Sequence, residues 1–258
     1  MKNYLIQCMV ITTLSISAIF AQAVSKTGTS AGQFLKIGVG SRAIGLGGAF
    51  TAIADDASSL YWNPSGIANN KTLSIFVDHY DWILDIEMDF IGFIIPLGSV
   101  GNLGISTNYL HMGEMEVTST KNPEGTGEKF SAASYLGQIS YARNLTERFS
   151  LGSSIKLIKE SIWNSTATGI AIDIGTLYKS TFPGLKLGMS ISNYGSKMKM
   201  DGRDLLVQTD LDPSLESDPE NLNSNLMTDE FDLPMIFRFG MSFSKKLKNG
   251  FGTILAID

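Results

Sequence analysis

The chain has 258 residues, a formal net charge of −5, 26 glycines and a single cysteine, and only 17% of its residues are charged. Its hydrophobic content of 43% excludes a disordered chain, the lone cysteine excludes a disulfide scaffold, and the acidic balance disfavours a nucleic-acid-binding surface. A soluble domain carries about 25% charged residues, whereas the mean hydropathy of +0.10 is too low for a bundle of transmembrane helices. This combination is typical of outer-membrane β-barrels.

Residues 1–23 have the pattern of a cleaved secretory signal peptide. Lys2 supplies the positive charge, residues 10–20 are apolar, and Ala21-Gln22-Ala23 gives the small–x–small pattern of a cleavage site. The alternative, a transmembrane anchor, is less favoured because the apolar run is shorter than the ~20 residues that a spanning helix needs. Cleavage would also remove Cys8, so we expect no disulfide, thiol nucleophile or cysteine–metal site in the mature chain.

Residues 24–70 contain many glycines and little alternation. Residues 38–43 match the dinucleotide-binding pattern G-x-G-x-x-G/A, and Asp55 and Asp56 follow at a distance that this pattern allows. A dinucleotide site is nevertheless disfavoured, because no clear apolar strand precedes the glycines and no βαβ alternation follows them. We expect these glycines to permit close packing of the backbone.

Residues 71–258 are dominated by alternation with period two. Between Phe237 and Phe243, for example, every second residue is large and apolar, and the residues between them are small or polar. Such alternation predicts barrel strands with one face in lipid and one face toward a polar lumen. A soluble β-sandwich with an apolar core is the alternative. We expect nine strands, at residues 71–80, 86–96, 102–112, 129–143, 148–160, 168–179, 184–194, 233–244 and 250–258.

The connections between these strands differ in length according to the end of the strands at which they lie. The tight turns 97–101, 144–147, 180–183 and 245–249 all fall at one end of the strands, and the long segments 113–128 and 195–232 fall at the other. Outer-membrane barrels have short periplasmic turns and longer extracellular loops. This difference therefore favours a barrel over a sandwich and predicts that the acidic segment 195–232 lies outside the cell.

The N-terminal part resembles a known family over residues 27–68. The resemblance rests on Gly48-Ala49-Phe50, Ala54-Asp55-Asp56-Ala57 and Asn63-Pro64-Ser65-Gly66. These motifs closely resemble the signature of the PorV/PorQ family of outer-membrane proteins, which is related to the FadL-type channels for hydrophobic substrates. The resemblance covers about 40 residues, and the later strands match in pattern alone.

The resemblance implies an all-β fold: a transmembrane antiparallel β-barrel of fourteen strands, with residues 24–70 as a plug inside the lumen and residues 71–258 as wall strands. Nine strands are an odd number, whereas bacterial single-chain barrels have an even number, so we expect the sequence to lack about five strands at its C-terminal end. The residues implied to order or gate the plug are Gly47, Gly48, Ala49, Phe50, Asp55, Asp56, Asn63, Pro64 and Gly66.

The polar residues of these motifs suggest structural roles. Asp55 and Asp56 are adjacent, so we expect their side chains to diverge and to bind plug backbone or a lumen Arg or Lys rather than to act as an acid–base pair. Asn63-Pro64 predicts a turn. His79 and His111 lack the spacing of a metal site.

Aromatic residues mark candidates for the interfacial girdles of a barrel. These candidates are Trp62, Trp82, Trp163, Tyr80 and Tyr178. No catalytic, phosphate-binding or metal-binding motif stands out in the sequence. We therefore expect no enzyme activity, no metal and no cofactor.

Three functions follow as hypotheses. The favoured one is a PorV/PorQ-like component of type IX protein secretion, with translocon or cargo proteins as partners. The second is a FadL-like channel for a hydrophobic small molecule, and the third is a structural or adhesive barrel. All three place the protein in outer-membrane lipid, without nucleic acid.

Overall fold

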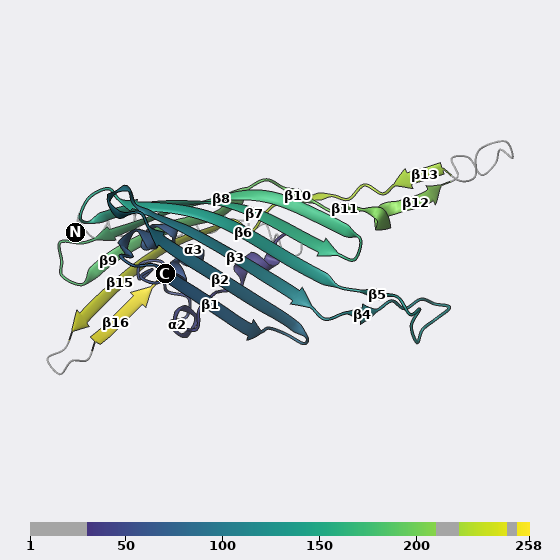
Figure 1. Ribbon diagram of the computed structural model, residues 1–258, viewed down its shortest axis with the longest axis horizontal. Coiled ribbons are helices and arrows are strands. Elements are labelled where there is room, and N and C mark those ends of the chain that lie inside the picture. Colours follow the sequence, from purple (N-terminus) through teal and green to yellow (C-terminus); the bar gives the residue numbers. More distant parts are fainter. Residues whose placement is uncertain (1–29, 210–221, 247–251) are drawn as a thin grey trace, which may run out of the picture. The chain divides into compact units, whose positions relative to one another are not determined.

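A single antiparallel sheet dominates the computed structural model, which describes residues 30–209, 222–246 and 252–258. Its main path has the order β1-β2-β3-β6-β7-β8-β9-β15-β16 (Figure 1), and each strand pairs with the next. The signal peptide expected at residues 1–23 lies outside the described residues. The long strands are β1 (Ser74–Asp81), β2 (Ile86–Pro96), β3 (Asn102–Met112), β6 (Ala132–Asn144), β7 (Phe149–Ile162), β8 (Ser165–Lys179), β9 (Leu185–Gly195), β15 (Ile236–Lys246) and β16 (Gly252–Ile257). The prediction of an all-β, antiparallel fold is confirmed.

Each expected strand corresponds to one long strand, but the connection expected at residues 161–167 is much shorter. Strand β7 continues to Ile162 and β8 begins at Ser165, so only Trp163 and Asn164 form the turn. Trp163 has a φ of 50°, as two-residue hairpin turns require. The alternation fades there because the outward positions Lys159, Ser161, Thr166 and Thr168 are polar, although the backbone pairing continues.

The two long segments contain short strand pairs. Strands β4 (Met115–Glu116) and β5 (Lys129–Phe130) pair in the first. In the second, β12 (Leu206–Thr209) pairs with β13 (Leu222–Asn225) (Figure 1). The remaining short elements are β10 (Met198–Lys199), which pairs with β14 (Glu230–Phe231), β11 (Asp201–Gly202), which pairs with β8, and the 3₁₀ turns η3 (Gly98–Val100) and η4 (Arg203–Leu205).

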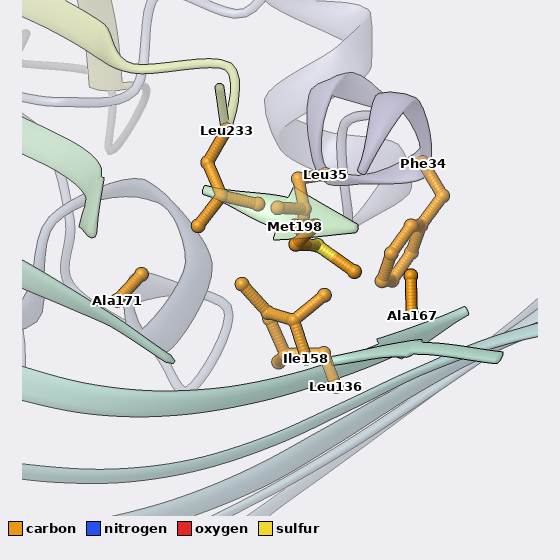
Figure 2. Packing of buried hydrophobic residues seen from close by; sticks show 8 residues of the cluster. All are labelled: Phe34, Leu35, Leu136, Ile158, Ala167, Ala171, Met198 and Leu233. Carbon is orange, nitrogen blue, oxygen red and sulfur yellow. The ribbon is translucent and has the colours of Figure 1, made fainter. Parts of the chain in front are cut away.

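Residues 31–70, here called the N-terminal segment, form four short helical turns that pack on one face of the sheet. They are η1 (Gln33–Lys36), α2 (Ser41–Gly45), α3 (Ser59–Trp62) and η2 (Pro64–Asn69). Figure 2 shows Phe34 and Leu35 of η1 packed with Ile158 of β7 and Met198 of β10. Since the main apolar clusters combine this segment with the strands, the core lies between the two.

The polarity of the two faces of the sheet is the reverse of that in a soluble sandwich. The inward face, which the N-terminal segment covers, carries small and polar residues such as Ser150 and Ser154 of β7. The outward face carries a row of large apolar residues that are register partners on neighbouring strands and are all exposed: Ile75, Phe93, Ile105, Ile139, Ile155 and Ile172. No described residue covers this face, so a sandwich with an apolar core does not describe the fold.

The candidate girdle aromatics divide between the faces. Trp82 and Trp163 are 48% and 46% exposed, and Tyr178 is also exposed. Trp62 instead belongs to the N-terminal segment itself, where its indole donates to Val39 O over 2.8 Å. Tyr80 points toward the same segment, and its hydroxyl donates to Gly38 O over 3.0 Å. The girdle interpretation of these two residues is wrong, because their polar atoms satisfy buried backbone groups.

Strands β1 and β16 stand at the two ends of the main path, and within the described ranges each pairs with one neighbour. Closure into a fourteen-stranded barrel therefore stays a prediction. Among the described residues, no helix has the length and apolar content needed to cross a bilayer.

Two isoleucines of β7 test the assignment of the faces. Ile158 is fully buried on the inward face, whereas Ile155 on the outward face is 64% exposed. We expect Ile158→Ala to lower the free energy of unfolding by about 2–5 kcal/mol because it leaves a cavity. Ile155→Ala should lower it by less than about 1 kcal/mol. Denaturant titration of both variants in detergent measures the difference, and equal losses would contradict the assignment.

Candidate functional site

Asn63 lies at the centre of the contact between the N-terminal segment and the sheet. Its side-chain oxygen accepts from Ser65 N over 3.2 Å and from the Ser65 hydroxyl over 2.7 Å, which starts η2 at Pro64. Its amide nitrogen donates to Thr51 O over 2.8 Å and to Thr176 O of β8 over 3.1 Å. One buried side chain therefore ties two parts of the segment to each other and to a strand.

Two strand glycines form the seat for this turn. Gly152 of β7 and Gly175 of β8 are register partners. A Cβ atom at Gly152 would collide with the backbone of Pro64, and one at Gly175 would collide with the side chain of Asn63. The close approach of the turn to the sheet therefore requires glycine at both positions.

Gly66 has the same function within the segment, because a Cβ atom there would collide with Ala54 O. Asn63, Pro64 and Gly66, which the N-terminal motifs predict as plug residues, lie together in the structure. Gly152 and Gly175 were not predicted, because their only signal in the sequence is their place on the small-residue face of the strands.

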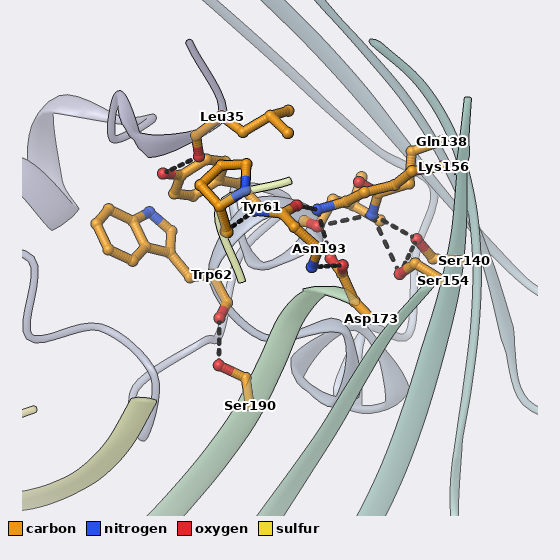
Figure 3. Close-up of polar contacts among 12 residues, drawn as sticks. Leu35, Tyr61, Trp62, Gln138, Ser140, Ser154, Lys156, Asp173, Ser190 and Asn193 are labelled. Carbon is orange, nitrogen blue, oxygen red and sulfur yellow. Dashed lines mark hydrogen bonds and ion pairs between the residues drawn. The ribbon is translucent and has the colours of Figure 1, made fainter. Parts of the chain in front are cut away.

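Inward polar side chains satisfy backbone carbonyl groups of α3. The Gln138 amide donates to Leu60 O over 2.8 Å and to the hydroxyls of Ser140 and Ser154, and the Ser190 hydroxyl donates to Trp62 O over 3.2 Å (Figure 3). The last carbonyls of a helix have no partner within it. The sheet supplies those partners here.

A buried ion pair lies beside these contacts (Figure 3). Lys156 Nζ of β7 is 2.6 Å from Asp173 Oδ2 of β8 and donates to the Asn193 side-chain oxygen over 2.8 Å. Asn193 has a φ of 62°, and its backbone N–H donates to Asp173 over 2.8 Å. Because the charges are opposite and hydrogen-bonded, the pair adds no net charge to the inward face.

Arg238 of β15 connects the sheet to the aromatic residues of α3. Its guanidinium carbon lies 5.7 Å from the Tyr61 ring centroid and 5.1 Å from that of Trp62. The Tyr61 hydroxyl donates to Leu35 O over 3.0 Å. Burial raises the pKa of Tyr61, and the positive charge of Arg238 opposes that rise.

Asp55 and Asp56 both bind Arg42 of α2. Arg42 Nη1 lies 2.5 Å from Asp55 Oδ1 and 3.2 Å from Asp56 Oδ2. The hydrogen bond with Asp55 raises the pKa of the Arg42 guanidinium above its usual value. The expectation that the two carboxylates diverge is wrong, because one planar guanidinium can serve both. Their arginine partner belongs to the N-terminal segment itself.

Gly47, Gly48, Ala49 and Phe50 form the turn that follows α2. Gly47 and Gly48 have φ values of 68° and 82°, and Gly48 N donates to Ala43 O over 2.9 Å. The buried Phe50 ring lies under the Arg42 guanidinium, 5.3 Å from its centroid. The Phe50 ring also lies 6.4 Å from the ring of Trp62, directly before the Asn63 turn, and the two residues belong to one buried cluster.

The histidines lie elsewhere, on the outward face. His79 Nδ1 is 2.8 Å from Asp89 Oδ1, and His111 Nε2 is 3.6 Å from Glu87 Oε2. Within the described parts of the chain, no group of three His, Cys, Asp or Glu side chains has a metal-binding arrangement. The contacts between the N-terminal segment and the sheet therefore hold a folded segment against a polar wall.

A glycine substitution tests the seat. We expect Gly175→Ala to displace Asn63 and so to speed amide hydrogen exchange in residues 51–66. Gly137→Ala is the matched control, because its Cβ atom would meet nothing within 4 Å. Hydrogen-exchange mass spectrometry measures both, and unchanged exchange in Gly175→Ala would show that the seat does not order the turn.

Comparisons with known proteins give one family match and one curated relative. The family model described as "Type IX secretion system protein PorV" matches residues 20–213, about three quarters of the chain. A protein of Treponema pallidum named "UPF0164 protein" is 25% identical over 174 residues. That match covers 62% of this chain but 43% of the relative, so the chain spans less than half the length of this curated relative.

Proposed function

The chain belongs to the PorV family, and from this premise we propose that it is an outer-membrane component of, or accessory to, type IX protein secretion. The resemblance in the N-terminal motifs is thereby confirmed, and this family is associated with the outer membrane. In the proposal the sheet is part of a barrel wall and the N-terminal segment is its plug. The chain binds and passes on proteins and has no catalytic role.

The outward face supports a wall in lipid. Its apolar row crosses six neighbouring strands, from Ile75 of β1 to Ile172 of β8. A lipid-facing barrel wall alternates apolar outward residues with polar inward ones. Because an unpaired strand edge is costly in lipid, we propose a closed, FadL-like barrel of fourteen strands in which the edges of β1 and β16 are paired.

The connections support an orientation. The β2–β3, β6–β7 and β8–β9 turns are short and lie at one end of the strands. The other end carries the short β1–β2 and β7–β8 connections and also both long segments, which contain β4–β5 and β12–β13. Following the usual barrel asymmetry, we assign the short-turn end to the periplasm and the long segments to the exterior, where secretion machinery or cargo proteins would bind.

The N-terminal segment occupies the inward face of the sheet, and this observation favours the secretion role over the channel role. Gln138 and Ser190 hold backbone of that segment, and Asn63 of the segment holds backbone of β8. An apolar cavity near Leu110 and Met112 has a volume of about 190 Å³, below the ~300–1,000 Å³ of ordinary ligand pockets. A second apolar cavity, lined by Met115, Phe130 and Trp163, has a volume of about 550 Å³. The FadL-like channel therefore remains the second candidate.

Epitope tags test the orientation. A tag after Asn122, between β4 and β5, should be labelled on intact cells. A tag after Ser99, in the β2–β3 turn, should be labelled only after the outer membrane is permeabilised. The reverse pattern would invert the orientation, and labelling of neither tag in the membrane fraction would contradict the barrel.

Removal of the protein tests its function. In cells of the source organism that lack the chain, we expect the release or surface display of type IX cargo to fall, because the proposed role is protein transfer. Uptake of a labelled long-chain fatty acid should be unchanged. Normal secretion with reduced fatty-acid uptake would replace the secretion role with the channel role, and complementation with the intact gene is the control.

A further inference from the structure

A polar cavity lies at the short-turn end of the sheet, on the far side of η2 from the Asn63 seat. Its volume is about 570 Å³, and it is lined by the last residues of η2, the β2–β3 turn and the ends of β6 and β8. This volume lies within the ~300–1,000 Å³ of small-molecule sites. The proposed secretion role does not use this cavity.

The charged residues that line this cavity are all cations. They are Lys71, Arg143 and Lys179. Lys179 Nζ donates to the Asn69 side-chain oxygen over 2.7 Å, whereas Lys71 and Arg143 make no side-chain hydrogen bond or ion pair with any residue in the described ranges. The cavity therefore offers positive charge without an internal counter-ion.

The neighbouring strand increases this positive charge. Lys186 of β9 is the register partner of Lys179, and like charges opposite each other in a sheet are destabilising. The negative charge of Asp55 attracts the Lys186 ammonium group, but this carboxylate is already bound by Arg42. An anion near Lys179 would relieve this repulsion.

Asparagines add hydroxyl-binding capacity to the cavity. The Asn102 amide donates to Ile67 O over 2.6 Å and to Asn70 O over 2.7 Å, which fixes its orientation. The Asn70 amide donates to the Ser74 hydroxyl over 3.2 Å. The side-chain oxygens of Asn70 and Asn102 receive no donor from the part of the chain that the structure describes, so they are free to accept from ligand hydroxyls.

We propose that this cavity binds a phosphate-bearing polyol of the glycerophosphate class. The cations hold the phosphate group, and the asparagine oxygens accept from the polyol hydroxyls. The same chemistry occurs in a free glycerophosphate and in the headgroup of phosphatidylglycerol. The site follows from the cavity itself and does not depend on the secretion role.

Titration of the detergent-solubilised chain with glycerol 3-phosphate, followed by calorimetry, tests the site. We expect the double variant Lys71→Gln/Arg143→Gln to weaken binding at least about tenfold, since two charge-assisted contacts are lost. The matched control is Lys121→Gln/Lys159→Gln, which removes the same charge from exposed positions outside the cavity and should bind like the parent. Glycerol without phosphate should not bind.

Nanodiscs distinguish the two sources of the ligand. Binding of soluble glycerol 3-phosphate that requires Lys71 and Arg143 identifies a free ligand. Retention of phosphatidylglycerol over phosphatidylcholine that requires the same residues, without soluble binding, identifies a lipid headgroup. The proposal is overturned if neither ligand binds, or if the cavity variant and the control variant bind equally.

Discussion

Burial of backbone carbonyl groups against the sheet is the constraint on which the rest of this structure depends. The carbonyls of Thr51, Leu60 and Trp62 all lie where the N-terminal segment meets the strands, and each accepts from a side chain there. A buried polar group without a partner costs roughly 1–3 kcal/mol. The inward face must therefore carry donors such as Gln138 and Ser190, and it cannot be a purely apolar surface.

The reversed polarity of the two faces of the sheet follows from this constraint. Strands alternate their side chains between faces, so polar residues inward place the large apolar residues outward. On β7, Ser154 is buried while the adjacent Ile155 is exposed. Apolar surface is favourable only away from water, and a lipid environment of the kind proposed for this family member removes it from water without a second protein layer.

The buried ion pair between Lys156 and Asp173 lies at an irregular point of the sheet. Removing either Lys156 or Asp173 would leave a buried charge uncompensated, which is strongly destabilising, although the intact pair itself is weak evidence for stability. The left-handed Asn193 contacts both members and lies within the register shift between β8 and β9, opposite Asp173. The pair therefore connects β7, β8 and β9 at the irregular point of the sheet.

The sequence by itself determined the all-β class, the places of nine long strands and the family, because these depend on local features. Period-two alternation is visible within one strand, and the Asn63-Pro64-Ser65-Gly66 motif lies within four consecutive residues. It failed at residues 161–167, where polar residues such as Ser161 and Thr166 occupy the outward positions and remove the alternation without ending the strands. Only the tertiary structure decided which residues face one another: Gly152 and Gly175 under Asn63, both carboxylates on Arg42, Trp62 in the interior, and the cations around one cavity. These juxtapositions join residues from distant parts of the chain, and the register and close approach that create them exist only once the segment and the strands have packed together.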